Sequence, residues 1–338
     1  MHTPDEEYEI LSEDNGWIDT VFAEELDSWF SADIACCDEC YDEFLNLWPH
    51  ADEADDYGFQ RSSIDMQSFY EGSRLREIYT QEQFDVLVTT LRCPRCGAGL
   101  EGVIWPYEFP FDIDDSFELE LEIESIAEVA RNTPFLLLEN ELAQKIHSLI
   151  KQLGESKEAE SFTEHLYRAR VFKDRRQYDL DDFECPPRSL VGEGRYNHAG
   201  LPVLYLGNEI QTCFHELRES KCVAVKVQLR GKAKVLDLTN PYDSSVDGNE
   251  TLNALVYSSL LSAKHSGDGW HKPEYVFSRF IADCARSAGY DAIKYPSTRV
   301  SEGSYNVVFL DQRRSLAKAW NVLNCFVFDG DNVRCYQE

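Results

Sequence analysis

Short apolar runs separated by polar turns fill the second half of the chain and predict β-strands. Runs of this kind that are rich in Val, Leu and Ile are typical of strands in a buried sheet. We expect strands over residues 203–206, 223–229, 235–238, 292–295 and 307–310. Asp329-Gly330 lies between two apolar-rich segments, so this dipeptide predicts a closing hairpin.

The middle of the chain carries a helical period. After Pro134, apolar side chains recur at steps of four and three, at Leu138, Leu142, Ile146, Leu149 and Leu153. Pro134 favours a helix start and Gly154 a helix end, so we expect one amphipathic helix here. Just upstream, apolar and acidic residues alternate over Phe117–Ile123, and this alternation predicts a strand.

Helices are also expected between the strands of the second half. Asn208 is a suitable N-cap for a helix that runs to about Arg218, with Gln211 at the reciprocal capping-box position. The predicted buried stripe of this helix consists of Ile210, Phe214 and Leu217.

A further helix is expected near Val276–Ala288, ending at Gly289. Short strands interspersed with a few helices favour an α+β fold with a split mixed sheet. The sequence shows neither βαβ alternation nor a glycine-rich phosphate fingerprint, so a Rossmann dehydrogenase is disfavoured.

Composition and charge narrow the class of protein. The length of 338 residues favours two domains over a single core. Hydrophobic residues make up 43% and aromatic residues 12%, enough for buried cores despite a net charge of −30, so a disordered acidic protein is excluded. The sequence has no Lys or Arg before Arg61. So acidic an N-terminal half disfavours direct DNA or RNA binding, and a solvated surface is favoured over a docking surface for a basic partner.

The sequence also bears on location. The N-terminus lacks the basic and apolar regions of a secretory signal, and the longest apolar runs, such as Phe135–Leu138, are too short for a bilayer span. We therefore expect a cytoplasmic protein without membrane contact. We expect the eleven cysteines to be reduced, because the chain is too long for a disulfide-stapled mini-domain and its cysteine pairs have metal-ligand spacing.

Two C-x-x-C pairs in the N-terminal region predict a metal site. These are Cys37 with Cys40 and Cys93 with Cys96. Zinc is the default ion for four such sulfur atoms, and four protein ligands leave no open position for water, so a structural role is expected. Cys36 is an alternative ligand to Cys37, and unligated cysteines are the competing interpretation. A thioredoxin-like redox pair is disfavoured, because the strand and helix pattern of that fold does not surround either pair.

Several short pieces follow one another in the second half of the chain. They are Leu166-Tyr167-Arg168, Gly194-Arg195-Tyr196-Asn197, Leu204-Tyr205-Leu206, Cys213-Phe214-His215-Glu216-Leu217-Arg218, Tyr295-Pro296-Ser297 and Asn306-Val307-Val308. Their order, over roughly residues 164–315, resembles the RES domain. At Asn197-His198-Ala199-Gly200 the chain departs from the Asn-Pro-x-Gly turn common among relatives, so the turn chemistry differs there.

The resemblance implies an enzyme that degrades NAD through a fold related to the ADP-ribosyltransferases. The expected parts are an acidic Cys-rich domain over residues 1–110, a connector with the amphipathic helix over 111–163, the RES domain over 164–315 and an extension over 316–338. Some larger RES proteins are similar in carrying a Cys-rich segment before the enzymatic domain. Small RES proteins are typically toxins restrained by an antitoxin, so the resemblance also implies an inhibitory protein partner.

The same resemblance assigns roles to individual residues. Glu216 matches the family glutamate, and a carboxylate beside the ribose would stabilise the cation that forms as nicotinamide leaves. Arg168 matches the family arginine and would hold the diphosphate of NAD with a bidentate fork, with Arg170 as the rival assignment. Ser297 would meet ligand hydroxyls or phosphate.

Arg195 and Tyr205 are further ligand-binding candidates. Arg195 would be a second cation near the ligand, and a structural ion pair is an equal alternative for it. Tyr205 would pack its ring against nicotinamide or adenine, although a tyrosine in an apolar strand is often a core residue. A serine-histidine triad is disfavoured, because neither His198 nor His215 stands in a supporting motif.

We therefore predict cleavage of the nicotinamide–ribose bond of NAD with water or phosphate as acceptor. An ADP-ribosyltransferase that modifies a macromolecule is the first alternative. The second is a non-catalytic scaffold of a zinc ribbon and an inactive RES-like module, and the presence of Arg168, Glu216 and Ser297 argues against it.

Overall fold

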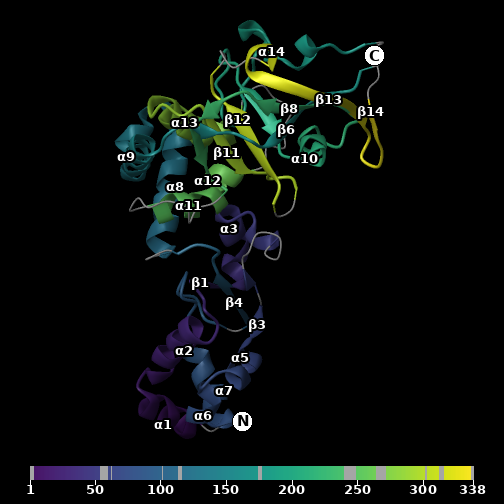
Figure 1. The fold of residues 1–338 in the computed structure, drawn as a ribbon. Coiled ribbons are helices and arrows are strands. Elements are labelled where there is room, and N and C mark those ends of the chain that lie inside the picture. The colour runs from purple at the N-terminus through teal and green to yellow at the C-terminus, as the bar shows by residue number, and fades with distance from the viewer. Residues whose placement is uncertain are drawn as a thin grey trace. The chain divides into compact units, whose positions relative to one another are not determined.

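The computed structural model divides into two compact units, residues 1–123 and residues 124–338 (Figure 1). It describes residues 4–53, 60–61, 63–100, 102–112, 116–173, 177–239, 249–263, 272–300, 303–311 and 316–335. Each unit has its own sheet and its own buried core. In this described part of the chain, no helix is both long and apolar enough to cross a membrane.

The N-terminal unit is built on a small antiparallel sheet in which β4 pairs with each of the other strands. The strands are β1 (Ile34–Cys37), β2 (Gln60–Arg61), β3 (Ile64–Asp65) and β4 (Val103–Glu108). The helices are α1 (Pro4–Asp14), α2 (Trp17–Ser28), α3 (Asp38–Leu47), α5 (Met66–Gly72), α6 (Leu75–Ile78) and α7 (Gln81–Leu87), with the 3-10 turns η1 (Ala51–Glu53) and η2 (Val88–Thr90).

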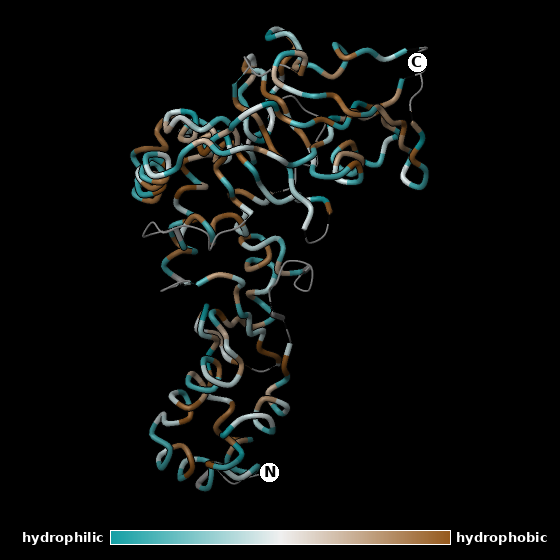
Figure 2. Tube along the Cα trace, viewed as in Figure 1, coloured by the Kyte–Doolittle hydropathy of each residue, from teal (hydrophilic) through white to brown (hydrophobic). Residues whose placement is uncertain are grey.

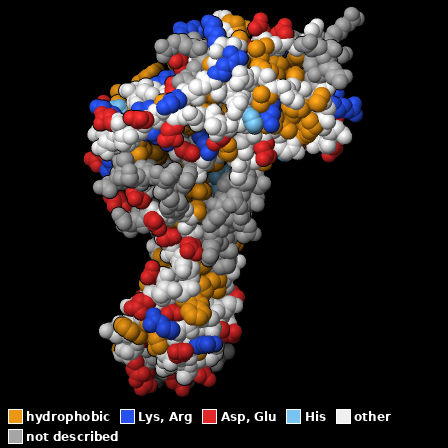
Figure 3. Space-filling model, in the orientation of Figure 1, with side chains coloured by type: hydrophobic (Ala, Val, Ile, Leu, Met, Phe, Trp, Pro, Cys, Tyr) orange, Lys and Arg blue, Asp and Glu red, His pale blue; other side chains and the backbone are white. Residues whose placement is uncertain are grey.

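Aromatic rings fill the core of this unit. Phe44 packs on Tyr107 with ring centroids 4.3 Å apart, and Trp48 packs on Phe109 at 4.8 Å. Buried aromatic pairs of this geometry add to the stabilisation from apolar burial. Outside the core, Asp and Glu side chains are spread over the visible face of the unit (Figure 3).

The strand predicted over residues 117–123 is wrong, because this segment is the start of helix α8 (Ser116–Asn132). Leu119, Ile123 and Ile126 are buried, whereas Leu121 is 51% exposed. The buried residues recur at steps of four and three, so the helical period decides over the local alternation. Glutamate between these positions also favours a helix over a strand.

The C-terminal unit is an eight-stranded sheet with helices around it. Its strand order is β10-β11-β12-β7-β6-β8-β13-β14, and β10 and β11 are parallel whereas the other neighbours are antiparallel. The strands are β6 (His165–Val171), β7 (Leu204–Gly207), β8 (Cys222–Leu229), β10 (Val235–Asp237), β11 (Ala292–Pro296), β12 (Tyr305–Phe309), β13 (Trp320–Phe328) and β14 (Val333–Cys335). The predicted α+β fold with a mixed sheet is therefore confirmed.

The C-terminal unit also has a second, small sheet and several helices. A two-stranded sheet pairs β5 (Glu160–Ser161) with β9 (Lys232–Ala233). The helices are α9 (Glu141–Ser156), α10 (Ile210–Glu216), α11 (Asn249–Tyr257), α12 (Ser259–Ser262), α13 (Val276–Ser287) and α14 (Leu316–Ala319), with the 3-10 turns η3 (Pro134–Glu139), η4 (Leu180–Phe183), η5 (Arg188–Leu190) and η6 (Pro273–Tyr275).

Strand β8 contributes to an apolar cluster on each face of the large sheet. Val223, Val225 and Val227 point into one apolar cluster, and the alternate residues Cys222 and Ala224 point into a second. The first half of β8, residues 222–225, is buried on both faces and is a continuous apolar run, whereas the half-buried Lys226 and Gln228 alternate with apolar residues in its second half. Figure 2 shows the apolar residues concentrated along the strands of this sheet.

The helix predicted after Pro134 begins later than expected. Residues 134–139 form η3, and the Asn140 side chain caps α9 by accepting a hydrogen bond from the Ala143 backbone N–H at 3.2 Å. Gly154 does not end the helix, because α9 continues to Ser156. At Gly154 a Cβ would lie 2.8 Å from the Ala288 carbonyl oxygen, so this glycine permits α9 to approach the end of α13 closely.

The predicted cap of α10 is also wrong. The N-cap is Glu209, which makes no side-chain capping bond. Asn208 instead accepts a hydrogen bond from the Tyr305 backbone N–H at 3.1 Å and donates to the Gly303 carbonyl at 3.2 Å, so it ties the start of α10 to β12. The buried stripe is confirmed, since Phe214 is buried and Ile210 and Leu217 pack beside it. The helix predicted to end at Gly289 and the β13–β14 hairpin are confirmed as well.

Candidate functional site

The large sheet is split between β6 and β7, and the candidate site lies at this split. The two strands pair only at Tyr167 and Gly207, whereas β6 pairs with β8 along its whole length. The Arg168 guanidinium spans the gap by donating from Nη1 to the Tyr205 carbonyl at 2.8 Å. A side chain therefore supplies a link where main-chain pairing is missing.

A cavity of about 300 Å³ opens beside the split. It is lined by Arg168, Ala169, Arg170, Arg195, Tyr205, Leu206, Gly207, Cys213, Glu216, Leu217, Arg218, Lys272, Tyr275, Tyr295, Thr298, Arg299 and Asn306. Among these described residues, six carry a positive charge and Glu216 is the one carboxylate. Such a lining favours an anionic ligand that also has a cation-like part to place beside Glu216.

Glu216 is the last residue of α10, and β12 and the end of β11 hold its carboxylate. Asn306 donates from Nδ2 to Oε1 at 2.9 Å, and the Ser297 hydroxyl donates to the same oxygen at 3.3 Å. The second oxygen, Oε2, lies 3.8 Å from Nε of Arg299. The Glu216 side chain is 36% exposed, so the carboxylate is oriented by the sheet and still open to a ligand.

Ser297 lies beneath this carboxylate and is only 1% exposed. Its hydroxyl also accepts a hydrogen bond from the Arg299 backbone N–H at 3.3 Å, and its own N–H donates to the Ser304 carbonyl. Ser297 is thus not among the described residues that line the cavity. The sequence predicted contact between this hydroxyl and the ligand; the structure places it against Glu216.

Arg168 of β6 is buried and Arg170 is half-buried, and both donate hydrogen bonds to main-chain carbonyls. Arg168 donates from Nε to the Phe183 carbonyl at 3.3 Å in addition to its bond to Tyr205. Arg170 donates to the carbonyls of Asp182 and Glu184, at 3.0 and 2.7 Å. Burial, and then the charge of Arg170, lowers the pKa of Arg168 to about 10, so it stays protonated at neutral pH. Both arginines line the cavity and also fix the segment around η4.

Arg195 and Tyr205 are similarly engaged. Arg195 donates to the Leu261 carbonyl, to the Ala263 carbonyl at 2.7 Å and to the Thr298 hydroxyl at 3.1 Å. The structural role of Arg195 therefore consists of hydrogen bonds to two carbonyls and a hydroxyl, in place of the ion pair that was the alternative to ligand contact. The guanidinium also lies over the Tyr275 ring, 4.7 Å from its centroid.

The Tyr205 hydroxyl holds the Gly194–Asn197 turn. It accepts a hydrogen bond from the Tyr196 backbone N–H at 2.9 Å and donates to Oδ1 of Asn197 at 3.0 Å. Burial raises the pKa of Tyr205 above its usual range, so the hydroxyl remains a donor. A Cβ on Gly194 would lie 2.8 Å from this hydroxyl, which explains the glycine. Tyr205 is also one of the residues that line the cavity.

The cavity lining includes polar residues that were not assigned a role from the sequence, among them Asn306, Arg299, Arg218 and Lys272. Asn306 stood in one of the family pieces, and its place on β12 opposite Gly207 of β7 brings it to the split. Arg218 is the last residue of the motif that runs from Cys213 to Arg218. Arg299 and Lys272 lie in loops without a local signal, and only the fold brings them to the cavity.

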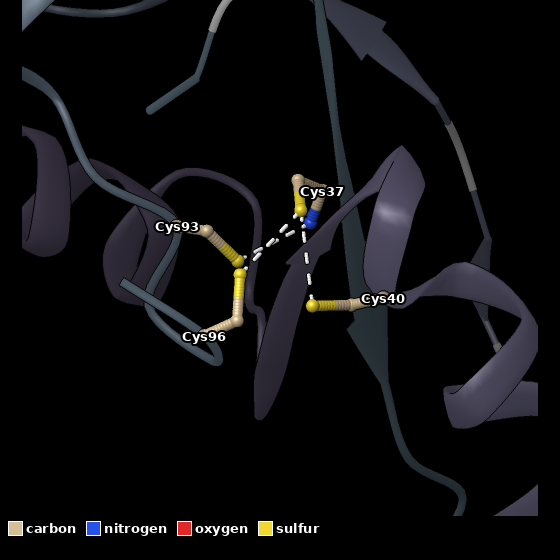
Figure 4. Close-up of side chains that lie close together, drawn as sticks. All are labelled: Cys37, Cys40, Cys93 and Cys96. Carbon is tan, nitrogen blue, oxygen red and sulfur yellow. Dashed lines mark hydrogen bonds between the residues drawn. The ribbon is translucent and has the colours of Figure 1, made fainter. Parts of the chain in front are cut away.

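The four cysteines predicted as metal ligands lie together in the N-terminal unit (Figure 4). Their Sγ atoms are all within 4.8 Å of one another, and Cys37 lies 3.7 Å from Cys40 and 3.8 Å from Cys96. The Cys37 backbone N–H donates to the sulfur of Cys93 at 3.4 Å. The group comprises Cys37 and not the neighbouring Cys36. This arrangement can hold a metal ion.

Arg95, between the cysteines of the second pair, is part of a buried polar network. It lies 3.2 Å from Oε2 of Glu120 on α8, and both side chains are under a tenth exposed. Glu120 also accepts a hydrogen bond from the Trp48 indole at 2.7 Å, and Arg95 donates to the Cys40 carbonyl at 3.3 Å. The network joins the two halves of the cysteine cluster to α8.

Comparisons with known proteins bear on the C-terminal unit. Residues 165–324 match the family model described as the RES domain. Among solved structures, the chain is similar to one in the crystal structure of the M. tuberculosis MbcT-MbcA toxin-antitoxin complex. The two are 15% identical with a TM-score of 0.33, and the match covers 53% of this chain and 91% of that chain. No curated protein matches the chain.

Proposed function

Residues 165–324 of this chain are a RES domain, and from this premise we propose that the chain cleaves the bond between nicotinamide and ribose in NAD. The observation that carries the proposal is the cavity at the split of the sheet. Its described lining holds six cations and a single carboxylate, that of Glu216. NAD has matching chemistry, with a diphosphate for the cations and a ribose that becomes cationic as nicotinamide leaves.

Glu216 would act on the ribose. As the C–N bond to nicotinamide breaks, its electron pair leaves with the ring nitrogen and the ribose carbon gains positive charge. A carboxylate fixed next to that carbon stabilises the charge without reorienting during the reaction. Asn306 and Ser297 both donate to Oε1, so Oε2 is the oxygen we assign to the ribose. Water or phosphate then attacks the same carbon through oxygen, and water releases its proton to solvent.

The assay is release of nicotinamide from NAD by the purified full-length chain. Glu216→Gln keeps the size of the side chain and removes its charge, and Glu219→Gln is the matched control, since Glu219 is 69% exposed and lies outside the described cavity lining. We expect release by wild type and by the control, and a loss of at least about a hundredfold in Glu216→Gln, in line with removal of one electrostatic stabiliser. Equal release by all three proteins would refute the proposal.

The acceptor follows from the products of the same reaction. Hydrolysis gives ADP-ribose at a rate independent of phosphate, whereas phosphate as acceptor gives a phosphorylated product and a rate that rises with phosphate. Transfer to a macromolecule would instead leave labelled ADP-ribose on protein or nucleic acid. Each of these outcomes is read from NAD labelled in the adenosine half.

The family resemblance further suggests a toxic activity restrained by a protein partner. Depletion of NAD is harmful to any cell, so expression of wild type should slow growth and expression of Glu216→Gln should not. A protein that co-purifies with the chain and suppresses nicotinamide release would be the restraining partner. Normal growth and unchanged NAD content on expression of active enzyme would contradict the toxin assignment.

For the cysteine cluster we propose structural zinc. A tetrahedral ion with Zn–S bonds of about 2.3 Å separates its sulfur ligands by about 3.8 Å, and the Sγ atom of Cys37 lies 3.7 Å from that of Cys40 and 3.8 Å from that of Cys96. Four cysteines can fill the coordination shell, so Cys37, Cys40, Cys93 and Cys96 would hold the ion and stabilise the fold of the N-terminal unit. Elemental analysis should find one zinc per wild-type chain and none in a Cys93→Ser/Cys96→Ser variant.

A further inference from the structure

A buried ion pair lies behind Lys272, one of the residues that line the cavity at the sheet split. Nη1 of Arg279 lies 3.4 Å from Oε2 of Glu193, and the two side chains are 5% and 18% exposed. Arg279 belongs to α13, whereas Glu193 lies in the segment between η5 and β7. Neither is among the described residues that line this cavity, so we look for the role of the pair in what it holds.

The pair binds both backbone groups of Lys272. The Lys272 N–H donates to Oε2 of Glu193, and the Lys272 carbonyl accepts from Nη1 of Arg279, each at 3.1 Å. The two atoms that form the ion pair are therefore the same two atoms that hold the chain at Lys272. Hydrogen bonds to charged groups are among the stronger ones in proteins, so these contacts fix the backbone of Lys272.

Lys272 leads directly into η6, which supplies the next part of the cavity lining. The Tyr275 backbone N–H donates to the Lys272 carbonyl at 3.1 Å, and Tyr275 lines the cavity as well. The Arg195 guanidinium lies 4.7 Å from the centroid of the Tyr275 ring. We refer to Lys272 and Tyr275 as the η6 wall. A shift of the backbone at Lys272 would move this wall and change its contact with Arg195.

The turn that carries Glu193 is itself fixed in the fold. Asn197 is 4% exposed, and its Nδ2 donates to the Gly192 carbonyl at 3.0 Å. The Asn197 carbonyl accepts from the Gly194 N–H, also at 3.0 Å, so the residues on both sides of Glu193 are bound to Asn197. The Tyr205 hydroxyl in turn donates to Oδ1 of Asn197. Glu193 is therefore a fixed point to which the η6 wall can be attached.

The pair faces open space on another side. Glu193 and Arg279 line a second cavity of about 680 Å³, together with residues of η3, α9 and α13. A side chain that faces a cavity lacks van der Waals contacts in that direction. The hydrogen bonds of the pair, and not close packing alone, therefore hold Lys272 in place.

We propose that Glu193 and Arg279 are positioning residues, which hold the η6 wall where NAD binds. The choice of NAD as the ligand rests on the proposed function. The carboxylate of Glu216 is oriented from other elements, by Asn306 on β12 and Ser297 after β11. Loss of the pair should therefore weaken ligand binding and raise KM for NAD, and it should leave kcat close to the wild-type value.

The test separates positioning from stability by removing one charge or both. In Arg279→Met the buried Glu193 carboxylate loses its ion-pair partner, so the free energy of unfolding should fall. Glu193→Leu/Arg279→Met removes both charges and should be more stable than Arg279→Met, because apolar side chains can replace a buried ion pair at little cost. This double variant nevertheless lacks both hydrogen bonds to the backbone of Lys272.

Binding should not recover together with stability. Calorimetry on the full chain measures ADP-ribose binding, and we expect Glu193→Leu/Arg279→Met to bind about ten- to a hundredfold more weakly than wild type, the range for loss of hydrogen bonds to charged groups. Glu193→Gln/Arg279→Met keeps an oxygen that can accept from the Lys272 N–H, so it should bind more tightly than the Leu/Met variant.

Asp283→Asn is the matched control. Asp283 on α13 pairs with His198 after the same turn at 2.7 Å, but this pair is about half exposed, and neither residue is among the described residues that line the cavity at the split. The control should bind ADP-ribose within about twofold of wild type, as for an exposed ion pair.

The inference is overturned if the Leu/Met variant binds ADP-ribose as wild type does, or if its kcat falls while KM is unchanged. It is also overturned if this variant is no more stable than Arg279→Met and binds equally weakly, since the pair would then serve the fold. A wild-type chain that binds ADP-ribose and releases no nicotinamide refutes the proposed cleavage, and the binding comparison still decides the role of the pair. The two proposals therefore fail separately.

Discussion

Replacing Asn306 by alanine removes the shortest hydrogen bond to the Glu216 carboxylate. Asn306 is 5% exposed, and its Nδ2 lies 2.9 Å from Oε1 of Glu216, whereas the Ser297 hydroxyl lies 3.3 Å from that oxygen. In the variant the carboxylate keeps the longer of these two bonds. We predict that its orientation toward the ribose becomes less well defined and that turnover falls.

The size of the effect follows from the chemistry of the bond. A hydrogen bond to a charged group contributes about 1.5–3 kcal/mol, and about 1.4 kcal/mol corresponds to a tenfold change in rate. If this contribution is realised in the transition state, kcat falls by about ten- to a hundredfold with little change in KM. Because the Glu216 side chain is 36% exposed, water replaces part of the lost bond in the folded state, so the loss in stability should stay near about 1 kcal/mol.

Nicotinamide release at saturating NAD and urea unfolding measure the two quantities on the same preparation. Ser297→Ala is the graded comparison, and its longer bond predicts a smaller loss of kcat. The reasoning is refuted if Asn306→Ala keeps full kcat. It is also refuted if Asn306→Ala lowers the residual single-turnover rate of Glu216→Ala as much as it lowers that of wild type, because the asparagine would then act independently of the carboxylate.

Three more outcomes are expected. Arg95→Ala should destabilise the N-terminal unit by about 3–5 kcal/mol in chemical unfolding, because it leaves the buried Glu120 carboxylate without its ion-pair partner. In Arg95→Met/Glu120→Leu both charges are removed, so this double variant should be more stable than Arg95→Ala. Equal stability of the two variants would contradict the reasoning. Gly154→Ala should lower the stability by about 1–3 kcal/mol, because the added Cβ would lie 2.8 Å from the Ala288 carbonyl oxygen. This loss is expected although alanine has the higher helix propensity. An unchanged or raised Tm would count against close packing of α9 against Ala288. Removal of bound zinc by a chelator should unfold the N-terminal unit, with recovery of far-UV circular dichroism when zinc is returned; identical spectra with and without metal would exclude a structural role.

Several central strands of the C-terminal unit could be predicted because most of their residues are buried, whereas β13 and β14 are largely exposed and only their hairpin was predicted. Val223–Leu229 begins with three apolar residues and then alternates apolar and polar residues, and both patterns predict a strand at this length. The segment 117–123 was ambiguous, since its apolar residues alternate and also fit steps of four. Only burial of Ile123 and Ile126 on one side of α8 decides between these periods.

Local capping signals were less reliable than the apolar pattern. Asn208 has the chemistry of an N-cap, but its side chain meets the backbone of Tyr305, 97 residues away in the chain. Asn140, for which no cap was predicted, does cap α9. A polar side chain near a helix end can hydrogen-bond to any group that the fold brings close to it, but a prediction from the sequence considers only groups that are close along the chain.

Some residues of the candidate site could be predicted from the sequence and others could not. Glu216, Arg168 and Arg195 lie in short motifs that could be recognised in the sequence, and the spacing of the two cysteine pairs predicted their cluster. The hydrogen bonds from Asn306 and Ser297 to one oxygen of Glu216, and the places of Arg218 and Lys272 in the same cavity lining, arise from separate elements and have no local signature in the sequence. The sequence also could not show that Arg168 donates hydrogen bonds to the carbonyls of Phe183 and Tyr205.

The most direct test of the central claim is the conversion of NAD by wild type and by Glu216→Gln, followed in time by the appearance of free nicotinamide. The account predicts that wild type releases nicotinamide in step with loss of NAD, and that Glu216→Gln, folded and still able to bind ADP-ribose, releases almost none. Nicotinamide release by Glu216→Gln at the wild-type rate would contradict the assignment of this carboxylate and of the cavity around it.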